Sequence, residues 1–230
     1  MPLQDISFTD LIASSIHDMK NSVNVQVNAL EKMALQSRAQ GDQSGFDELV
    51  LVINQAHRMN ANLIQLLTLY KLGKSIYPID IDERSVADVI SETLLQMRTV
   101  FEFKGIALDV QCAPDCYGYF DRDLVTGVLL NALNNACNYT QDKIRVTAQF
   151  ENGFLALRVE DNGQGYPSHL LLAEGVAAAK GVNFLSGSTG LGFYFSSLVA
   201  QLHQNNGKQG ELIIENGGAY GGGCFVLKLP

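Results

Sequence analysis

Three short segments in the second half of the chain constrain its fold and function more than any other feature. The first is Asn-rich and reads LNALNNACNYT at residues 130–140. Two glycine motifs follow it, DNGQG at residues 161–165 and GSTGLG at residues 187–192. Glycines at fixed spacing mark places where the backbone turns sharply or approaches another group closely. Each segment alone is weak evidence, whereas the three in this order and at this spacing form a strong signal.

Together, the three segments resemble the nucleotide pocket shared by histidine kinases, gyrase and the heat-shock-90 chaperones. The resemblance implies that ATP and Mg²⁺ bind here, with Asn135 as the magnesium ligand and Asn131 lining the same cleft. It also implies that Asp161 accepts a hydrogen bond from the adenine amino group.

The same resemblance assigns roles to the glycines. The backbone at Gly163 and Gly165 would pass close to the base, because neither residue carries a Cβ. Gly190 and Gly192 would open a helix whose free amides meet the phosphates. The expected nucleotide-binding set is completed by Asn138, Tyr139, Thr189 and Leu191.

Two features depart from the pattern of the relatives. They usually carry a basic residue where Asn138 stands, and Asn lacks the charge for the expected phosphate contact. Residues 167–186 correspond to the ATP lid; here the segment is short and apolar, with Lys180 as its cation and Phe184 as a poor substitute for the usual phenylalanine motif. We therefore expect modest affinity for ATP.

Residues 7 to about 72 have the apolar spacing of two helices. The apolar stripes comprise Phe8, Leu11 or Ile12, Ile16, Met19, Val23, Val27 and Leu30, then Phe46, Leu49, Ile53, Ala56, Leu63, Leu67 and Tyr70, with the polar Asn60 in the second seam. The polar linker at 37–45 is short, which predicts an antiparallel hairpin. Capping pairs at Ser7 and Asp10 and at Ser44 and Asp47 mark the predicted helix starts.

A two-helix hairpin cannot bury a whole apolar stripe by itself. The simplest partner is a second copy of the chain, which predicts a homodimer built on a four-helix bundle. The alternative is that the hairpin packs on the second domain of its own chain.

The pattern changes after Gly73. We expect helices at 85–103, 124–138 and 190–203, and strands at 106–111, 144–150, 154–160, 211–215 and 224–229. The expected fold class is α+β, with the hairpin at residues 1–75 and an α/β sandwich, one mixed sheet covered by helices, at residues 76–230. The resemblance makes the first part a dimerisation and phosphoacceptor domain and the second a catalytic ATP-binding domain.

The first helix carries another resemblance. HDMKNSV at residues 17–23 resembles the phosphorylation box of sensor histidine kinases, in which the histidine takes the γ-phosphoryl group of ATP and passes it to an aspartate of a response regulator. The resemblance implies that His17 is the nucleophile, since a neutral imidazole prevails at cell pH. Asp18 would be the general base, and Asn21 would orient water that hydrolyses the regulator's phosphoaspartate. Ser22 replaces the usual Pro, so we expect a less bent helix.

The predicted function is therefore an ATP-dependent protein histidine kinase that autophosphorylates on His17 and phosphorylates the receiver domain of a response regulator, with dephosphorylation of that regulator as a second activity. One alternative is a histidine phosphotransfer adaptor whose nucleotide domain no longer turns over ATP, and the intact glycine motifs count against it. Another is an ATP-gated binding protein of the chaperone or anti-sigma type, which has no use for the His-Asp-x-x-Asn pattern.

Composition narrows the partners. The net charge of −8 argues against nucleic acid or an anionic membrane as the main partner, and no run approaches the length of an apolar membrane span. Free thiols are expected, because a structural zinc site needs four ligands that the cysteines do not bring together. These cysteines are Cys112, Cys116, Cys137 and Cys224.

The start of the chain favours a natural full-length protein. Ile6 and Leu11 are placed for a hydrophobic staple around the first cap, and Pro2 would interrupt a helix arriving from upstream. We expect a cytoplasmic protein that receives its signal from a separate sensory partner.

Overall fold

Two compact units make up the chain, Met1–Pro78 and Ile79–Pro230. The structure is a computed structural model that describes residues 8–171 and 190–230. Within those ranges, no helix combines the length and the apolar character that crossing a membrane would require.

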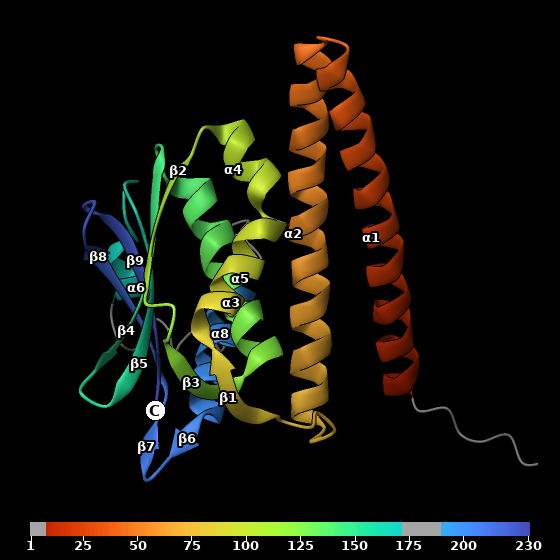
Figure 1. Cartoon of the computed structure of the whole chain (residues 1–230). Coiled ribbons are helices and arrows are strands. Elements are labelled where there is room, and N and C mark those ends of the chain that lie inside the picture. Colours follow the sequence, from red (N-terminus) through yellow and green to blue (C-terminus); the bar gives the residue numbers. More distant parts are fainter. Residues whose placement is uncertain (1–7, 172–189) are drawn as a thin grey trace, which may run out of the picture. The chain divides into compact units, whose positions relative to one another are not determined.

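The first unit is a hairpin of two long helices, α1 (Phe8–Ala39) and α2 (Gln43–Gly73), joined by residues 40–42 (Figure 1). The apolar side chains buried along its described part are Ile16, Val23, Val27 and Ala34 on α1 and Phe46, Val50 and Ile53 on α2. Asn60, the polar residue of the predicted seam, donates from Nδ2 to Asn24 Oδ1 at 2.7 Å. α1 runs as one helix through Ser22. The predicted helical hairpin is confirmed, and the homodimer stays a prediction.

The predicted cap of α2 is wrong, because Ser44 and Asp47 both lie inside the helix. The N-cap is Asp42, whose Oδ1 accepts a hydrogen bond from the Gly45 amide at 3.0 Å and whose Oδ2 accepts one from Ser37 Oγ at 3.0 Å. Asp caps a helix as well as Ser does, and its charge also interacts favourably with the helix dipole. Asp42 therefore starts the helix before the Ser-x-x-Asp pattern.

The second unit is built on a five-stranded sheet in the order β2 (Ala107–Cys112), β4 (Lys143–Glu151), β5 (Phe154–Asp161), β9 (Gly222–Leu229) and β8 (Glu211–Gly217). β2 runs parallel to β4, and the other neighbours are antiparallel. α5 (Arg122–Tyr139) and α8 (Leu191–Leu202) pack on one face of the sheet, and α3 (Val86–Gln96) packs on α5 (Figure 1). This mixed sheet covered by helices confirms the predicted fold class.

The burial of apolar side chains explains why the helices pack on this face of the sheet. Along each strand every second side chain points toward them, and these side chains are almost completely buried: Ile144 and Val146 on β4, Leu157 and Val159 on β5, and Phe225 and Leu227 on β9. Burying apolar surface in this way is the main favourable term in folding.

Other elements differ from the predictions. The single helix expected at 85–103 is two, α3 and α4 (Arg98–Lys104), because the backbone leaves helical geometry at Met97 with φ −104° and ψ 3°. Four short strands were not predicted: β1, β6 and β7 contain few apolar residues, and β3 is a short segment to which no element was assigned. They form two pairs, β1 (Ile81–Ser85) with β3 (Tyr117–Asp121) and β6 (Gln204–Asn205) with β7 (Lys208–Gln209). A short helix, α6 (Ser168–Leu171), follows β5.

The Asp42 cap gives a first prediction. Asp42→Ala should lower the free energy of unfolding by about 1 kcal/mol, because the Gly45 amide loses its acceptor. Ser44→Ala is the matched control and should change it by less than about 0.5 kcal/mol. Chemical denaturation followed by circular dichroism, at one fixed protein concentration, measures both. A larger effect at Ser44 than at Asp42 would contradict this account of the helix start.

Candidate functional site

A buried carboxylate marks the centre of the site. Asp161 is the last residue of β5 and is 4% exposed. Its Oδ1 accepts hydrogen bonds from two backbone amides, Gly163 at 2.7 Å and Gly223 at 3.3 Å. The hydrogen bonds that described residues donate to Asp161 thus end on Oδ1, which leaves Oδ2 as an acceptor for a ligand. A buried carboxylate needs such partners, because burial of an unpaired charge is costly.

Close backbone contact fixes the turn that follows Asp161. A Cβ at Gly163 would lie 2.0 Å from the carbonyl oxygen of Tyr139, so only glycine lets this turn meet the end of α5. Gly165 adopts φ +77°, a conformation that favours glycine. Asn216 holds the same turn, since its side chain accepts from the Tyr166 amide at 2.6 Å and donates to the Tyr166 carbonyl at 2.9 Å.

Asn162, between Asp161 and Gly163, has a structural part that the sequence reading missed. Its Oδ1 accepts from Thr140 Oγ1 at 2.7 Å and lies 3.1 Å from the amide nitrogens of residues 141, 142 and 143. Its Nδ2 donates to Asp142 Oδ1 at 2.7 Å. Asn162 therefore ties the glycine turn to the loop after α5. The signal was present, since an Asx side chain often bonds a nearby backbone, but its partners lie about twenty residues away in sequence.

Asn131 brings α5 and α8 together. Its Nδ2 donates to Ser196 Oγ at 3.2 Å, and that hydroxyl donates to the Gly192 carbonyl at 2.8 Å. A Cβ at Gly192 would lie 2.1 Å from Asn131 Oδ1, so the first turn of α8 rests directly on the asparagine side chain. Asn131 is therefore engaged in holding α8, and Asn135, one turn further along α5, is the half-buried amide on the same side of the helix.

The start of α8 has the features of an anion site. Gly190 is its N-cap with φ +61°, and among the described residues no side chain caps this end. Leu191 and Gly192 belong to the first turn. The first amides of a helix have no partner within the helix and carry partial positive charge. They are therefore available to an anionic ligand.

An aromatic contact joins the glycine turn to α8. The rings of Tyr166 and Phe193 meet edge to face with centroids 5.9 Å apart, and Phe193 stacks on Phe225 of β9 at 6.4 Å. Burial, and then the charge of Asp161, raises the pKa of the Tyr166 phenol well above its ordinary value. The phenol stays protonated at neutral pH, so it presents a hydrogen-bond donor and no second negative charge beside Asp161.

The other predicted residues fall in three groups. Asn138 and Tyr139 are exposed at the end of α5. Asp18 and Asn21 are exposed on α1 in the first unit, where Ser22 Oγ donates to the Asp18 carbonyl at 3.0 Å. His17 belongs to the same helix, but its side chain lies outside the described residues, as does the whole of Thr189. Residues 172–186, the rest of the predicted lid after its first residues, also lie outside them.

Similarity to known proteins covers most of the second unit. Residues 120–230 match the family described as histidine kinase-, DNA gyrase B-, and HSP90-like ATPase. The signal transduction histidine-protein kinase AfsQ2 of Streptomyces coelicolor is 24% identical over 230 aligned residues, which cover 94% of this chain and 41% of AfsQ2. This chain spans less than half the length of the first curated relatives it matches.

Solved structures share the fold. Full-length ShkA, crystallised in complex with AMPPNP, covers 96% of this chain and 45% of its own, with a TM-score of 0.62 at 16% identity. The histidine kinase AdeS of Acinetobacter baumannii covers 90% of this chain and 96% of its own, with a TM-score of 0.58 at 16% identity.

The contribution of the Asn162 hydrogen bonds, which connect the glycine turn to the loop after α5, can be tested directly. Asn162→Ala should lower the free energy of unfolding by about 1 kcal/mol or more, because several amides after α5 lose a half-buried acceptor. Asn138→Ala, an exposed asparagine at the end of the same helix, is the control and should cost less than about 0.5 kcal/mol. Calorimetric unfolding of both variants checks this. Equal stability of the two would mean that the turn does not depend on Asn162.

Proposed function

Residues 120–230 belong to the histidine kinase-, DNA gyrase B- and HSP90-like ATPase family, and on that premise we propose that this chain is an ATP-dependent protein histidine kinase. It autophosphorylates on His17 and transfers the phosphoryl group to an aspartate in the receiver domain of a response regulator. The observation that carries the proposal is Asp161, a buried carboxylate whose Oδ2 accepts no hydrogen bond from any described residue, in the same unit as the start of α8, which no described side chain caps.

The site fits ATP at both ends. Asp161 Oδ2 can accept a hydrogen bond from the exocyclic amino group of adenine, and the amides of Gly163 and Gly223 hold the carboxylate in place through Oδ1. The first amides of α8 suit the negative charge of the phosphates. A base at Asp161 and phosphates at Gly190 to Gly192 therefore match both ends of the nucleotide, the adenine amino group and the negatively charged phosphates.

Magnesium also fits the available ligands. Mg²⁺ prefers oxygen donors and keeps several waters and phosphate oxygens, so a single protein ligand is enough. Asn135 is suited to that part, because Asn131 is already bonded to Ser196. When bound, the ion would neutralise phosphate charge as the transferred group leaves ADP.

The residues of α1 would carry the transfer. The lone pair of a neutral His17 nitrogen forms the bond to the γ-phosphorus, and the bond from that phosphorus to the bridging oxygen breaks, which leaves ADP. The proton on the other ring nitrogen then becomes more acidic, and Asp18 next in sequence would accept it. Asn21, one turn along, would orient water in the dephosphorylation of the regulator.

The hairpin supports a homodimer. Its two helices expose many large apolar side chains, more than an isolated hairpin in water would be expected to show. They are Met19, Val25, Met33 and Leu35 on α1 and Leu51, Val52, Met59, Ile64 and Leu66 on α2. A four-helix bundle of two copies would bury part of this surface. The use of ATP and of a response regulator implies a reaction in the cytoplasm, with a sensory partner as the source of input.

Asp161 is the sharpest test of the nucleotide site. Asp161→Asn should weaken ATP binding by one to two decades, because an amide can turn a donor toward the adenine amino group; the loss corresponds to about 1–3 kcal/mol. Glu160→Gln is the matched control, since Glu160 is a similarly buried carboxylate whose Oε1 accepts from the Ala219 amide instead. Titration calorimetry that finds equal ATP affinity in Asp161→Asn and wild type would contradict the proposed site.

His17 is tested by the chemistry of the label. Incubation with γ-labelled ATP should leave label that survives base and is lost in acid, as expected for a phosphoramidate, and His17→Ala should remain unlabelled. Asn21→Ala serves as the control: it should label normally and fail only to dephosphorylate the regulator.

Label on the His17→Ala protein would contradict the assignment. A wild-type chain that never labels from ATP, yet accepts a phosphoryl group from a phosphorylated regulator, would favour the phosphotransfer adaptor instead.

A further inference from the structure

His203 is buried where α8 ends. It is the C-cap of that helix and is 1% exposed, with its amide bonded to the Ala200 carbonyl at 3.0 Å and its carbonyl accepting from the Gly210 amide at 2.9 Å. None of the motifs or the proposed reaction uses this side chain. A buried imidazole with no evident catalytic task therefore calls for a physical explanation.

Both ring nitrogens are bonded, and the two bonds determine the protonation state. Nε2 lies 3.0 Å from the Asp121 amide, which can only donate, so Nε2 must accept. Nδ1 lies 2.7 Å from the Val199 carbonyl, which can only accept, so Nδ1 must carry the proton. The geometry thus requires a neutral imidazole with its proton on Nδ1.

Asp121, the partner of Nε2, starts the other helix of the site. Its Oδ1 accepts from the Leu124 amide at 3.0 Å and caps α5, and its Oδ2 accepts from the Asp80 amide at 3.0 Å. His203 therefore links the last turn of α8 to the first residue of α5. Further along, the same two helices meet through Asn131, Ser196 and Gly192. Two polar contacts thus set the position of α8 on α5.

The geometry points to His203 as a positioning residue of the nucleotide site. In its neutral form it holds α8 in register with α5. The phosphate-facing amides at Gly190 to Gly192 then keep their position relative to Asn135 on α5. This inference rests on the proposed function, since it concerns the same site. Protonation of His203 would place a second N–H against the Asp121 amide. It would therefore break the hydrogen bond between His203 and Asp121, which is the joint between α8 and α5.

Burial supports the neutral form. It lowers the pKa of His203 below the ordinary value near 6.5, although the Val199 carbonyl and the charge of Asp121 both act in the opposite direction. Neutral imidazole therefore prevails in the folded protein at pH 7. Below about pH 6.5 the unfolded chain takes up a proton more readily than the folded one. The stability of the joint then falls as the pH drops towards the folded-state pKa.

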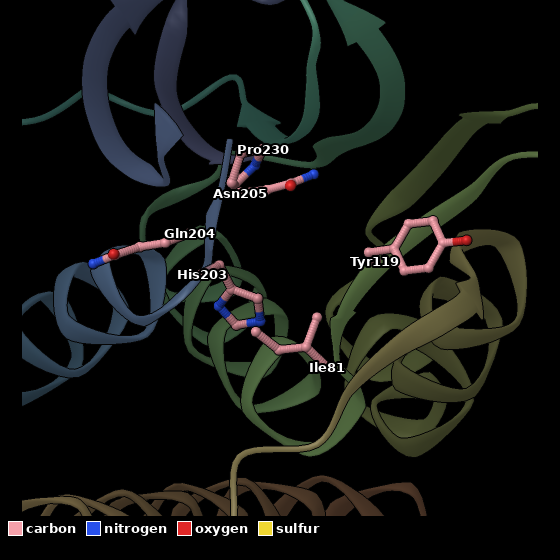
Figure 2. Close-up of a pocket in the computed structure, with 6 residues that line it drawn as sticks. All are labelled: Ile81, Tyr119, His203, Gln204, Asn205 and Pro230. Atoms are coloured by element: carbon pink, nitrogen blue, oxygen red, sulfur yellow. The ribbon is translucent and has the colours of Figure 1, made fainter. Parts of the chain in front are cut away.

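A pocket of about 320 Å³ lies beside the imidazole, and His203 is one of the residues that line it. Figure 2 shows His203 there between Gln204 and Ile81, with Tyr119, Asn205 and Pro230 around the opening. The titratable group whose charge acts on the ring is Asp121, from β3. Tyr119 also lines the pocket, but its phenol oxygen points away from the ring in Figure 2. Among the described residues that line the pocket, none is a lysine or arginine that would favour the neutral ring by repulsion.

The test compares affinity for AMPPNP with Mg²⁺ at about pH 8 and about pH 5.5, by calorimetry on the full chain. His203→Gln keeps an acceptor for the Asp121 amide and cannot titrate. Wild type should lose roughly tenfold more affinity on acidification than His203→Gln, the equivalent of one net hydrogen bond. Protonation of the nucleotide is common to both proteins, so it cancels in this comparison.

His57→Gln is the control, because His57 is a histidine of α2 that pairs with Glu31 at 3.4 Å, far from this joint in sequence. It should keep the full acid loss of the wild type. The inference is overturned if His203→Gln loses as much affinity in acid as the wild type does. Wild-type protein that binds no nucleotide at either pH would defeat the proposed function itself.

Ring nitrogen shifts in the wild type give a readout that needs no variant. Nuclear magnetic resonance should show His203 as the Nδ1–H tautomer at neutral pH, with a protonation midpoint below that of a free histidine and matching the loss of nucleotide binding. A His203 that titrates as a free histidine does, while affinity is unchanged across its midpoint, overturns the inference even if every variant fails to fold.

Discussion

The burial of the Asp161 carboxylate is the constraint on which the rest of the site depends. A carboxylate that is 4% exposed must be compensated, and here the backbone supplies the compensation through the amides of Gly163 and Gly223. Both donors are glycines because a Cβ at Gly163 would lie 2.0 Å from the Tyr139 carbonyl oxygen and one at Gly223 would lie 2.9 Å from Asp161 Oδ2. The same requirement brings the turn against the Tyr139 carbonyl, where Asn162 fastens it to the loop after α5.

The helices α5 and α8 form the rest of the site around Asp161, and polar contacts set the position of one helix relative to the other. Apolar packing on the sheet is strong but tolerates sliding, whereas a hydrogen bond holds for only one register. Asn131 with Ser196 and His203 with Asp121 provide such contacts between α5 and α8. The amides at the start of α8 and the amide of Asn135 are then held on a common frame. A site that must align a base, three phosphates and an ion benefits from this rigidity.

Elements whose signal is local could be predicted from the sequence. The two long helices follow from apolar spacing, the central strands from alternation, and the region of the site from its glycine motifs. Features that depend on distant partners were missed. Asp42 caps α2 although Ser44 and Asp47 match the capping pattern. The break between α3 and α4 at Met97 has no signal in the amino-acid composition. The residues of β1 are too polar to be predicted as a strand. Asn162 and His203 looked ordinary because their partners, around residue 141 and at Asp121, come together only in the fold.

The central claim is that one nucleotide binds between Asp161 and the start of α8, and a crystal structure of the chain with AMPPNP and Mg²⁺ tests it most directly. The account predicts the adenine amino group within hydrogen-bond distance, about 3 Å, of Asp161 Oδ2. It also predicts the phosphates against the amides of Gly190 to Gly192 and the ion on the Asn135 oxygen. Nucleotide bound elsewhere, for instance in the pocket beside His203, with Asp161 still facing only backbone amides, would contradict it.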